Sequence, residues 1–340
     1  MLQYWTSKPS VASVADDLRH GERKSSISSS ANYKESLQII LEICVLILAF
    51  GTKFIANRWL PTKFRIVHEA WVSFHAYMTK LYEEEKRIFA QCKASDHNLM
   101  TLLIHASQED QNNASGGLTE SEIYGNIFAF NFAGHDTTAN TFTFAVYFLA
   151  AYPKVQGWLA EEIHIVLGDR DPHTWDYRAD FPRLKRCLSV MFETMRLYTP
   201  VPIIKWTDKK SQPVVINGKT FVLPLNSMIA PSYGSVQTDL RFWGSDSPAW
   251  RPSRWIKAGK AGEESEGTRD CPGKKISQLE FVATMAVLFL RSCVDLTIQE
   301  GENIDAGRKR VMNMIEKDSG TVLLLQLLHP ERSPFVWRKN

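Results

Sequence analysis

The sequence contains no apolar run long enough to span a membrane. Its most hydrophobic stretch, Leu37–Phe50, is interrupted by Glu42 and is shorter than the roughly 20 residues that a transmembrane helix needs. Residues 1–34 are rich in serine, mixed in charge, and lack the apolar core of a signal peptide. We therefore expect neither a signal peptide nor a transmembrane anchor within this chain.

Cysteine is scarce, and so is any excess of one charge. The five cysteines are Cys44, Cys92, Cys187, Cys271 and Cys293. They are odd in number, far apart and without a Cys-x-x-Cys pair, which argues against a disulfide framework and against a zinc site.

The net charge is only +3, and the Lys and Arg residues are dispersed, which argues against a nucleic-acid-binding protein.

A length of 340 residues fits one large domain or two domains of ordinary size. The composition, 44% hydrophobic and 23% charged residues, is typical of a globular protein. Helical spacing of apolar residues predicts helices over 67–89, 118–152, 155–167, 182–197 and 272–292. A break near 57–62 precedes the first of these helices. Thr119 and Glu122 form a capping-box pattern at the start of the second, and Pro153 marks its end. Asn217-Gly218 between two β-runs predicts a hairpin, and 321–328 suggests strands.

The long helix predicted over 118–152 contains Ala-Gly-His-Asp-Thr-Thr at 133–138. Glycine and threonine are unfavourable in mid-helix. The Thr137 hydroxyl can bond to the carbonyl of Ala133 and bend or open the helix, leaving room for a ligand or water. A packing adaptation around Gly134 explains the run equally well.

A Glu–Arg pair lies near the end of the helix predicted over 182–197. Glu193 and Arg196 are three residues apart, so their charges can pair on one helix face. Most such pairs lie on the surface and contribute well under ~1 kcal/mol. Arg254, in the aromatic run Trp250–Trp255, is a candidate third member, and a buried cluster of this kind would fix local geometry rather than perform chemistry.

Cys271 lies in the run Gly-Thr-Arg-Asp-Cys-Pro-Gly-Lys-Lys at 267–275, with Pro272 at the first position of the last predicted helix. The helix dipole and the neighbouring cations favour a thiolate over a thiol. The glycines let the backbone approach a flat partner closely. Thiolate ligation of haem iron suits this environment, because a thiolate pushes electron density onto the iron.

In their order and spacing, AGHDTT, ETMR, the Trp250–Trp255 run and GTRDCPG resemble the signature motifs of the cytochrome P450 family, in particular its fungal members. The resemblance begins at about residue 33 and continues to the C-terminus. It implies a mainly α, incomplete P450 fold with a long central helix and a small β-region. We accordingly expect a poorly ordered segment, 1–33, and a partial P450 domain, 34–340, that starts at the family's F–G region.

The resemblance also implies roles for the motif residues. Thr137 would be the catalytic hydroxyl near bound dioxygen, and Asp136 its acidic neighbour in proton delivery. Glu193, Arg196 and Arg254 would form a structural triad. Cys271 would be the axial ligand to the iron of haem b. The other expected haem contacts are Arg269 at a propionate, and Gly267, Gly273, Ala133 and Gly134.

The implied reaction is the insertion of one oxygen atom from O2 into a hydrophobic organic substrate, in fungal secondary metabolism. An NADPH-dependent cytochrome P450 reductase would supply electrons, docking near Arg269, Lys274 and Lys275, although these lysines equally suit a solvated helix face. Residues 37–61 would touch the cytosolic face of the endoplasmic reticulum membrane. Five residues are candidates for substrate contact by their position in the family pattern: Phe130, Ala133, Val201, Ile203 and Ile204. Each of them could equally be an ordinary core residue.

Two departures from the family pattern leave an alternative open. The helix that carries the family's W-x-x-x-R motif is missing, and the one match, Trp250–Arg254, contains Pro252. Glu264 stands where the family has a phenylalanine that packs on the haem, and the charged stretch 257–266 is shorter than is typical. The alternative is a catalytically inactive P450 fragment, or the product of a mis-spliced gene, that does not bind haem productively.

Overall fold

The computed structural model describes residues 40, 51, 54–57, 59–90, 100–104, 117–201, 204–208, 210–256, 271–321 and 324–339. The chain divides into two compact units, Lys8–His135 and Asp136–Asn340, the second also including Met1–Ser7. Each unit is described by itself. The predicted segment 1–33 lies outside the described residues.

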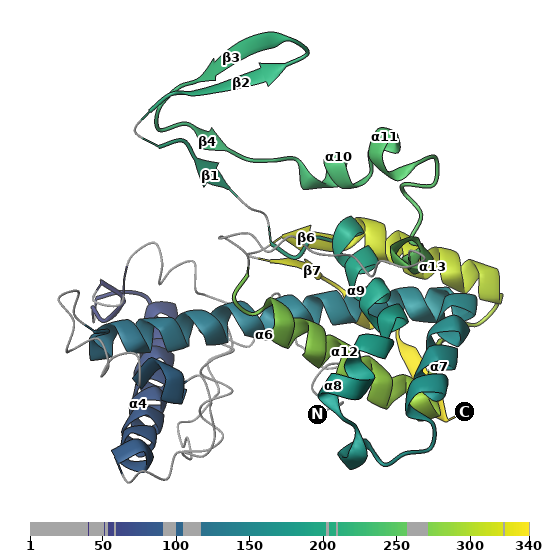
Figure 1. Ribbon diagram of the computed structural model, residues 1–340, viewed down its shortest axis with the longest axis horizontal. Helices are drawn as coiled ribbons and strands as arrows, with labels where there is room; N and C mark the ends of the chain where they lie inside the picture. The colour runs from purple at the N-terminus through teal and green to yellow at the C-terminus, as the bar shows by residue number, and fades with distance from the viewer. Residues whose placement is uncertain are drawn as a thin grey trace. The chain divides into compact units, whose positions relative to one another are not determined.

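The first unit is built on α4, Thr62–Ala90 (Figure 1). Apolar residues three or four positions apart give α4 one buried face, which includes Phe74, Met78 and Tyr82. This face packs with Ile123 and Ile127 in one hydrophobic cluster. The helix begins directly after Pro61, so the predicted break at 57–62 is confirmed.

Helix α6, Glu120–Ala151, is 32 residues long and contributes its first half to this unit. The predicted capping box is present, because the Thr119 backbone N–H donates to Glu122 Oε2 at 2.8 Å and the Glu122 N–H donates to Thr119 Oγ1 at 3.3 Å. The helix stops at Ala151 because Pro153 opens α7, Pro153–Leu167.

The second unit packs α7, α9 (Lys185–Leu197) and α12 (Lys274–Arg291) against one another (Figure 1). Side chains from the second half of α6, among them Phe144 and Phe148, lie in the same hydrophobic cluster as Phe281 and Phe289 of α12. Residues 144–151 of α6 are all buried, as expected for a helix that is apolar on every side. Short helices α8 (Tyr177–Asp180), α10 (Tyr233–Gln237) and α11 (Leu240–Trp243) lie in the connections.

The strands of the described chain form small antiparallel pairs. Strand β1 (Lys205–Trp206) pairs with β4 (Met228–Ile229), β2 (Gln212–Ile216) with β3 (Lys219–Leu223), β5 (Ser292–Leu296) with β8 (Phe335–Lys339), and β6 (Ser319–Thr321) with β7 (Leu325–Leu327). Asn217 and Gly218 have φ values of 51° and 76°, the left-handed conformation that a two-residue hairpin turn requires. The predicted hairpin, the strands near 321–328 and the mainly α fold are thus confirmed.

One sequence prediction was wrong. The helix predicted over 272–292 is not the last, because α13, Ile304–Lys317, follows it. Asn303 caps α13 by accepting from the Ala306 N–H at 2.8 Å. The charged run Arg308–Arg310 interrupts the apolar pattern and obscures the helical spacing of the buried residues Val311, Met314 and Ile315.

No helix among the described residues combines the length and the apolarity needed to cross a bilayer.

A buried amide ties the elements of the second unit together. Gln156 on α7 donates to the carbonyls of Leu149 and Val294 at 3.1 and 2.9 Å, and accepts from the Val294 N–H at 2.8 Å. Gln156 therefore joins the end of α6, the start of α7 and strand β5 where no regular hydrogen-bonding ladder does so.

Replacing this amide with an apolar side chain should destabilise the fold. We expect Gln156→Leu to lower the free energy of unfolding by roughly 2 kcal/mol or more, because buried backbone groups at Val294 and Leu149 lose their partner. Chemical denaturation measures the change. Gln299→Leu, at an exposed glutamine, is the matched control and should change stability by no more than ~0.5 kcal/mol. Equal losses would contradict the assigned role.

Candidate functional site

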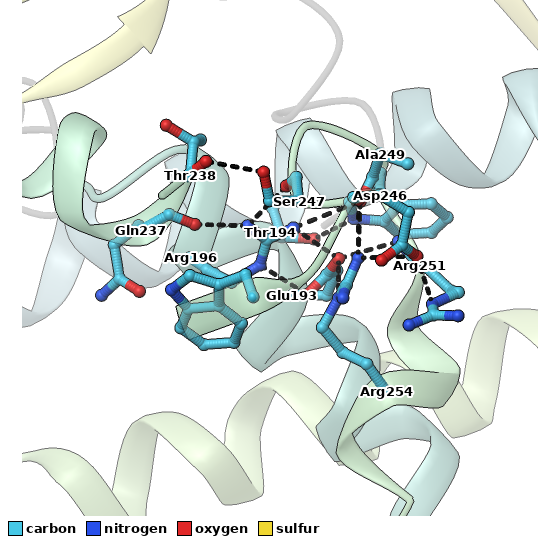
Figure 2. A network of polar contacts seen from close by, with 12 residues as sticks. Glu193, Thr194, Arg196, Gln237, Thr238, Asp246, Ser247, Ala249, Arg251 and Arg254 are labelled. Atoms are coloured by element: carbon cyan, nitrogen blue, oxygen red, sulfur yellow. Dashed lines mark hydrogen bonds and ion pairs between the residues drawn. The ribbon is translucent and has the colours of Figure 1, made fainter. Parts of the chain in front are cut away.

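The Glu193 carboxylate on α9 is fully buried and accepts hydrogen bonds on both oxygens (Figure 2). Arg196 approaches it with two nitrogens, Nε to Oε2 at 2.9 Å and Nη2 to Oε1 at 2.8 Å. Arg254 Nε reaches Oε1 at 2.8 Å, and the Arg251 backbone N–H reaches it at the same distance. The Trp255 indole donates to Oε2 at 2.9 Å. One carboxylate therefore holds donors from α9 and from the 3-10 turn Pro252–Trp255.

Arg196 uses its remaining donors on backbone carbonyls, one at the end of α10 and two beyond α11 (Figure 2). Its Nη1 donates to the carbonyls of Gln237 and Ser247 at 2.5 and 2.8 Å, and its Nη2 to that of Ala249 at 3.2 Å. The guanidinium carbon lies 4.9 Å from the ring centroid of Trp243. Arg196 thus fixes a stretch of chain with little secondary structure of its own.

A second layer of contacts surrounds the triad. Asp246 Oδ2 lies 2.9 Å from Arg251 Nε and 3.5 Å from Arg254 Nη2. The Trp250 indole donates to the Thr194 hydroxyl at 3.1 Å. We refer to Glu193, Arg196, Arg254, Asp246 and Trp255 together as the Glu193 network.

Burial alone would raise the pKa of Glu193. The hydrogen bonds from Arg196, the Arg251 backbone, Arg254 and Trp255 outweigh it, and the pKa lies below its ordinary value of 4.5. Glu193 is therefore a carboxylate held charged in the interior. Its contacts join α9 to residues 251–255 of the same chain. Holding the chain together in this way is the structural role that the resemblance implies for Glu193.

Cys271 lies at the N-terminal side of α12 and is exposed. The turn 272–273 separates it from the helix, and the Lys274 N–H donates to the Cys271 carbonyl at 3.1 Å. The helix therefore begins two residues later than predicted, within the usual uncertainty of helix ends. A Cβ added at Gly273 would lie 3.8 Å from Cys271 Sγ, so the glycine neighbours the sulfur without crowding it. Arg269, Gly267 and Glu264 lie outside the described residues.

The motif at 133–138 lies in α6, which is α-helical throughout Glu120–Ala151. Ala133 and Gly134 are exposed, Asp136 and Thr137 are half-buried, and Thr138 is buried. Further along the same helix, the Thr141 hydroxyl donates to the Thr137 carbonyl at 3.0 Å.

The substrate-contact candidates are apolar and only partly buried where the structure describes them. Phe130 is half-buried, and Val201 and Ile204 are 38% and 52% exposed. Ile203 lies outside the described residues.

Two members of the Glu193 network, Trp255 and Asp246, were not predicted. The sequence signal for Trp255 is its place in an aromatic run, and its indole N–H is a donor that a buried carboxylate can use. Asp246 lies in an irregular stretch where no periodicity predicts contacts. The carbonyl acceptors of Arg196 have no signal in the side-chain sequence.

Removing the charge of Glu193 should destabilise the second unit strongly. We expect Glu193→Gln to cost about 3–5 kcal/mol, because two buried guanidinium groups lose their counter-charge. Chemical denaturation measures the loss. Asp305→Asn breaks an ion pair of the same spacing, Asp305–Arg308 at 3.2 Å with the carboxylate 81% exposed, and should cost no more than ~0.5 kcal/mol. A small loss at Glu193 would show that the network adds little stability.

The pH dependence of stability gives a second test. The pKa of Glu193 is lower in the folded state than its ordinary value of 4.5, so ionisation of Glu193 stabilises the fold. This stabilisation is fully present above pH 4.5. It is lost as the pH falls from 4.5 toward the folded-state pKa. Urea denaturation at stepped pH should show this loss in the wild type, and Glu193→Gln should lack that component. Parallel pH profiles for the two proteins would contradict the lowered pKa.

A sequence profile of the cytochrome P450 family matches residues 27–318. A phomenoic acid biosynthesis cluster cytochrome P450 monooxygenase from Leptosphaeria maculans is 29% identical over 304 residues, which cover 76% of this chain and 52% of that protein. Cytochrome P450 monooxygenase 124 from Postia placenta is 25% identical over 322 residues, which cover 92% of this chain and 59% of that protein. The chain therefore spans little more than half the length of these relatives.

The fold agrees with this match. A crystal structure of a cytochrome P450 (CYP102L1) superposes with a TM-score of 0.60 at 18% sequence identity, covering 86% of this chain and 60% of that one. Members of the family bind haem b with a cysteine thiolate as ligand. Since the profile covers most of the sequence and the fold is that of the family, this chain belongs to the cytochrome P450 family.

Proposed function

We propose that this protein is a haem-dependent monooxygenase that inserts one oxygen atom from O2 into a hydrophobic organic substrate. The observation that carries the proposal is the position of Cys271, an exposed thiol one turn before α12 in a chain of the cytochrome P450 family. Because the chain covers about half of its relatives, the activity is inferred from the residues present here.

The residues around Cys271 fit a haem. The sulfur is accessible, and Gly273 beside it leaves space that a larger side chain would reduce. The start of α12, at Lys274, follows within three residues. We assign Cys271 as the axial ligand, with Gly267, Gly273, Ala133 and Gly134 along the haem and Arg269 at a propionate.

When bound, thiolate-ligated haem supplies the activation of O2. The protein's own residues hold the cofactor and move protons. We assign proton delivery to Asp136 and Thr137, which are half-buried on α6 and therefore remain reachable from water. The Glu193 network positions the chain on the N-terminal side of the cysteine segment.

The proposed substrate is hydrophobic because the contact candidates Phe130, Val201, Ile203 and Ile204 are all apolar. One relative is named for a phomenoic acid biosynthesis cluster, which supports a role in fungal secondary metabolism. An NADPH-dependent cytochrome P450 reductase is the proposed electron donor. Lys275, exposed on the first turn of α12, suits an acidic docking partner.

Residues 37–61 are proposed to contact the cytosolic face of the endoplasmic reticulum membrane. Within this stretch Phe54 is 46% exposed and Trp59 is 94% exposed. Exposed aromatic side chains are favoured at the membrane–water interface. The other residues of the stretch are mostly outside those that the structure describes.

The test is the reduced, CO-bound difference spectrum of the purified 340-residue protein. We expect a Soret band at the position typical of thiolate-ligated haem, because Cys271 supplies the sulfur ligand. Cys271→Ser should abolish that band. Cys293→Ser, at a half-buried free cysteine, is the matched control and should retain it.

Absence of haem from the wild-type protein, or a band that survives in Cys271→Ser, would overturn the proposal. Either result would favour the alternative of a catalytically inactive P450 fragment.

A further inference from the structure

The turn between β2 and β3 consists of Asn217 and Gly218, the only Asn-Gly pair in the sequence. In such a pair the side-chain amide carbon of the asparagine can come within reach of the next backbone nitrogen, and glycine has no side chain that hinders the approach. Attack by that nitrogen closes a cyclic imide and expels ammonia. Water then opens the imide at either of its two carbonyls, which leaves aspartate or isoaspartate.

The structure leaves the attacking nitrogen of Gly218 open. Asn217 and Gly218 are both exposed, and a Cβ added at Gly218 would meet no atom within 4 Å. The register pairs Ile216 with Lys219 across the turn, so the two turn residues themselves take no part in the strand pairing. Among the described residues, none accepts a hydrogen bond from the Gly218 N–H. This nitrogen therefore breaks no hydrogen bond when it reacts.

The hairpin can open without unfolding the rest of the second unit. Among the described strands, β2 and β3 pair only with each other, and most of their residues are exposed (Figure 1). A two-stranded hairpin of this kind is marginally stable in water, so it opens far more often than the packed helices do. The folded turn holds Asn217 at a φ of 51°, and opening lets its backbone and side chain rotate into the geometry that closes the ring.

Asn226 provides a contrast close by in the sequence. It is exposed and also has a left-handed φ, 56°. The nitrogen that would attack its side chain belongs to Ser227, and this N–H donates to Thr207 Oγ1 at 2.8 Å. The Ser227 carbonyl accepts from the Thr207 N–H at 2.9 Å. Two hydrogen bonds to a residue that is only 6% exposed therefore hold Ser227 in place, whereas no such bond holds the nitrogen of Gly218.

We propose that Asn217 is a site of spontaneous deamidation, and that the isoaspartate formed there is a substrate for an isoaspartyl carboxyl methyltransferase. The Gly218 nitrogen bonds to the side-chain carbonyl carbon of Asn217, the carbon–nitrogen bond of the amide breaks, and ammonia leaves with the proton of the Gly218 N–H. Water hydrolyses the imide, so the sequence needs no oxidant or reductant. The methyltransferase moves a methyl group from the sulfonium of S-adenosylmethionine to the new, exposed carboxylate. This inference goes beyond the oxygenase function and requires neither haem nor an oxygenase substrate.

Isoaspartate changes the hairpin more than aspartate does. Aspartate fits the same turn, because Asp-Gly favours the same positive φ values as Asn-Gly. Isoaspartate routes the main chain through the side chain and lengthens it by a methylene group. A two-residue turn fixes the register of the strands it joins, so the pairing of Ile216 with Lys219 is lost. The methyl group therefore marks a loosened hairpin.

The first experiment ages the purified full chain in neutral buffer and follows each asparagine by tryptic digestion and mass spectrometry. Lys210 and Lys219 flank Asn217, so its peptide is separate from the one that carries Asn226. Conversion of the amide to a carboxyl group changes the peptide mass. In the folded protein we expect Asn217 to react at least about tenfold faster than Asn226, because the hairpin opens readily and the Gly218 nitrogen is not held.

A parallel sample in guanidinium chloride separates the effect of the fold from that of the neighbouring residue. Unfolding should raise the rate at Asn226 by about fivefold or more, because Ser227 is released from Thr207. It should change the rate at Asn217 by less than about threefold, because the folded hairpin protects that residue little. The ratio of the unfolded to the folded rate at each site cancels the intrinsic difference between Asn-Gly and Asn-Ser.

The second experiment adds an isoaspartyl carboxyl methyltransferase and labelled S-adenosylmethionine. Aged wild-type protein should accept methyl groups, and fresh protein should accept few. Asn217→Gly is the matched variant, because Gly-Gly also suits the turn and has no side chain that can cyclise. After the same ageing it should lose most of the methyl acceptance. Its thermal unfolding should match that of the wild type, since residue 217 is exposed.

The proposal is overturned if the peptide that carries Asn217 keeps its mass during ageing, or if folding slows Asn217 and Asn226 to the same extent. It is also overturned if aged Asn217→Gly accepts as many methyl groups as the aged wild type, because the isoaspartate would then lie elsewhere in the chain. A mass change at Asn217 without methyl acceptance refutes the methyltransferase as a partner and shows that the product is aspartate.

Discussion

The burial of the Glu193 carboxylate is the constraint on which much of the second unit depends. A charge with no solvent exposure is tolerated only when every oxygen is satisfied, and Glu193 achieves this with two arginines, an indole and a backbone N–H. Arg196 extends the constraint, since its other nitrogens bind the carbonyls of residues 237, 247 and 249. Between α10 and the 3-10 turn Pro252–Trp255 the chain forms the four-residue helix α11 and single turns, and the contacts of Arg196 hold it against α9. Coulombic attraction and hydrogen bonding here supply ordering that such short elements do not provide by themselves.

This constraint bears directly on the proposed haem ligand. The network ends at residues 254 and 255, the last turn before the segment that leads to Cys271. On the other side of the cysteine, α12 begins at Lys274 and buries Phe281 and Met285 in the core that α9 shares. Residues 254 and 255 are therefore anchored by charge and hydrogen bonds, and α12 is anchored by hydrophobic packing. Helix α9 contributes to both anchors.

Local chemistry could be predicted from the sequence, whereas contacts between distant residues could not. The capping box of Thr119, the Asn217-Gly218 turn and the start of α7 at Pro153 each follow from a few neighbouring residues, and each is present. The spacing of Glu193 and Arg196 predicted one helix face but not its burial, because most pairs of that spacing are solvated. The acceptors of Arg196 are backbone carbonyls more than forty positions away in an irregular stretch. Helix α13 was missed because its charged run hides the apolar spacing.

Buried polar groups of the described residues differ in whether each N–H and each oxygen has a hydrogen-bond partner. Both oxygens of the buried Glu193 carboxylate accept hydrogen bonds. Asn140 on α6, by contrast, is only 9% exposed, and its amide nitrogen has no hydrogen-bond partner among the described residues. The indole nitrogen of Trp175 is in the same position. An unsatisfied buried donor costs about 1–3 kcal/mol, which a sequence selected for stability alone would avoid. Asn140 lies one helical turn beyond Asp136 and Thr137, the residues to which we assign proton delivery. Asn140 is available to donate to a ligand bound beside these residues, whereas Trp175, in the connection between α7 and α9, has no assigned chemistry near it. An unsatisfied buried donor therefore does not by itself mark a reaction site.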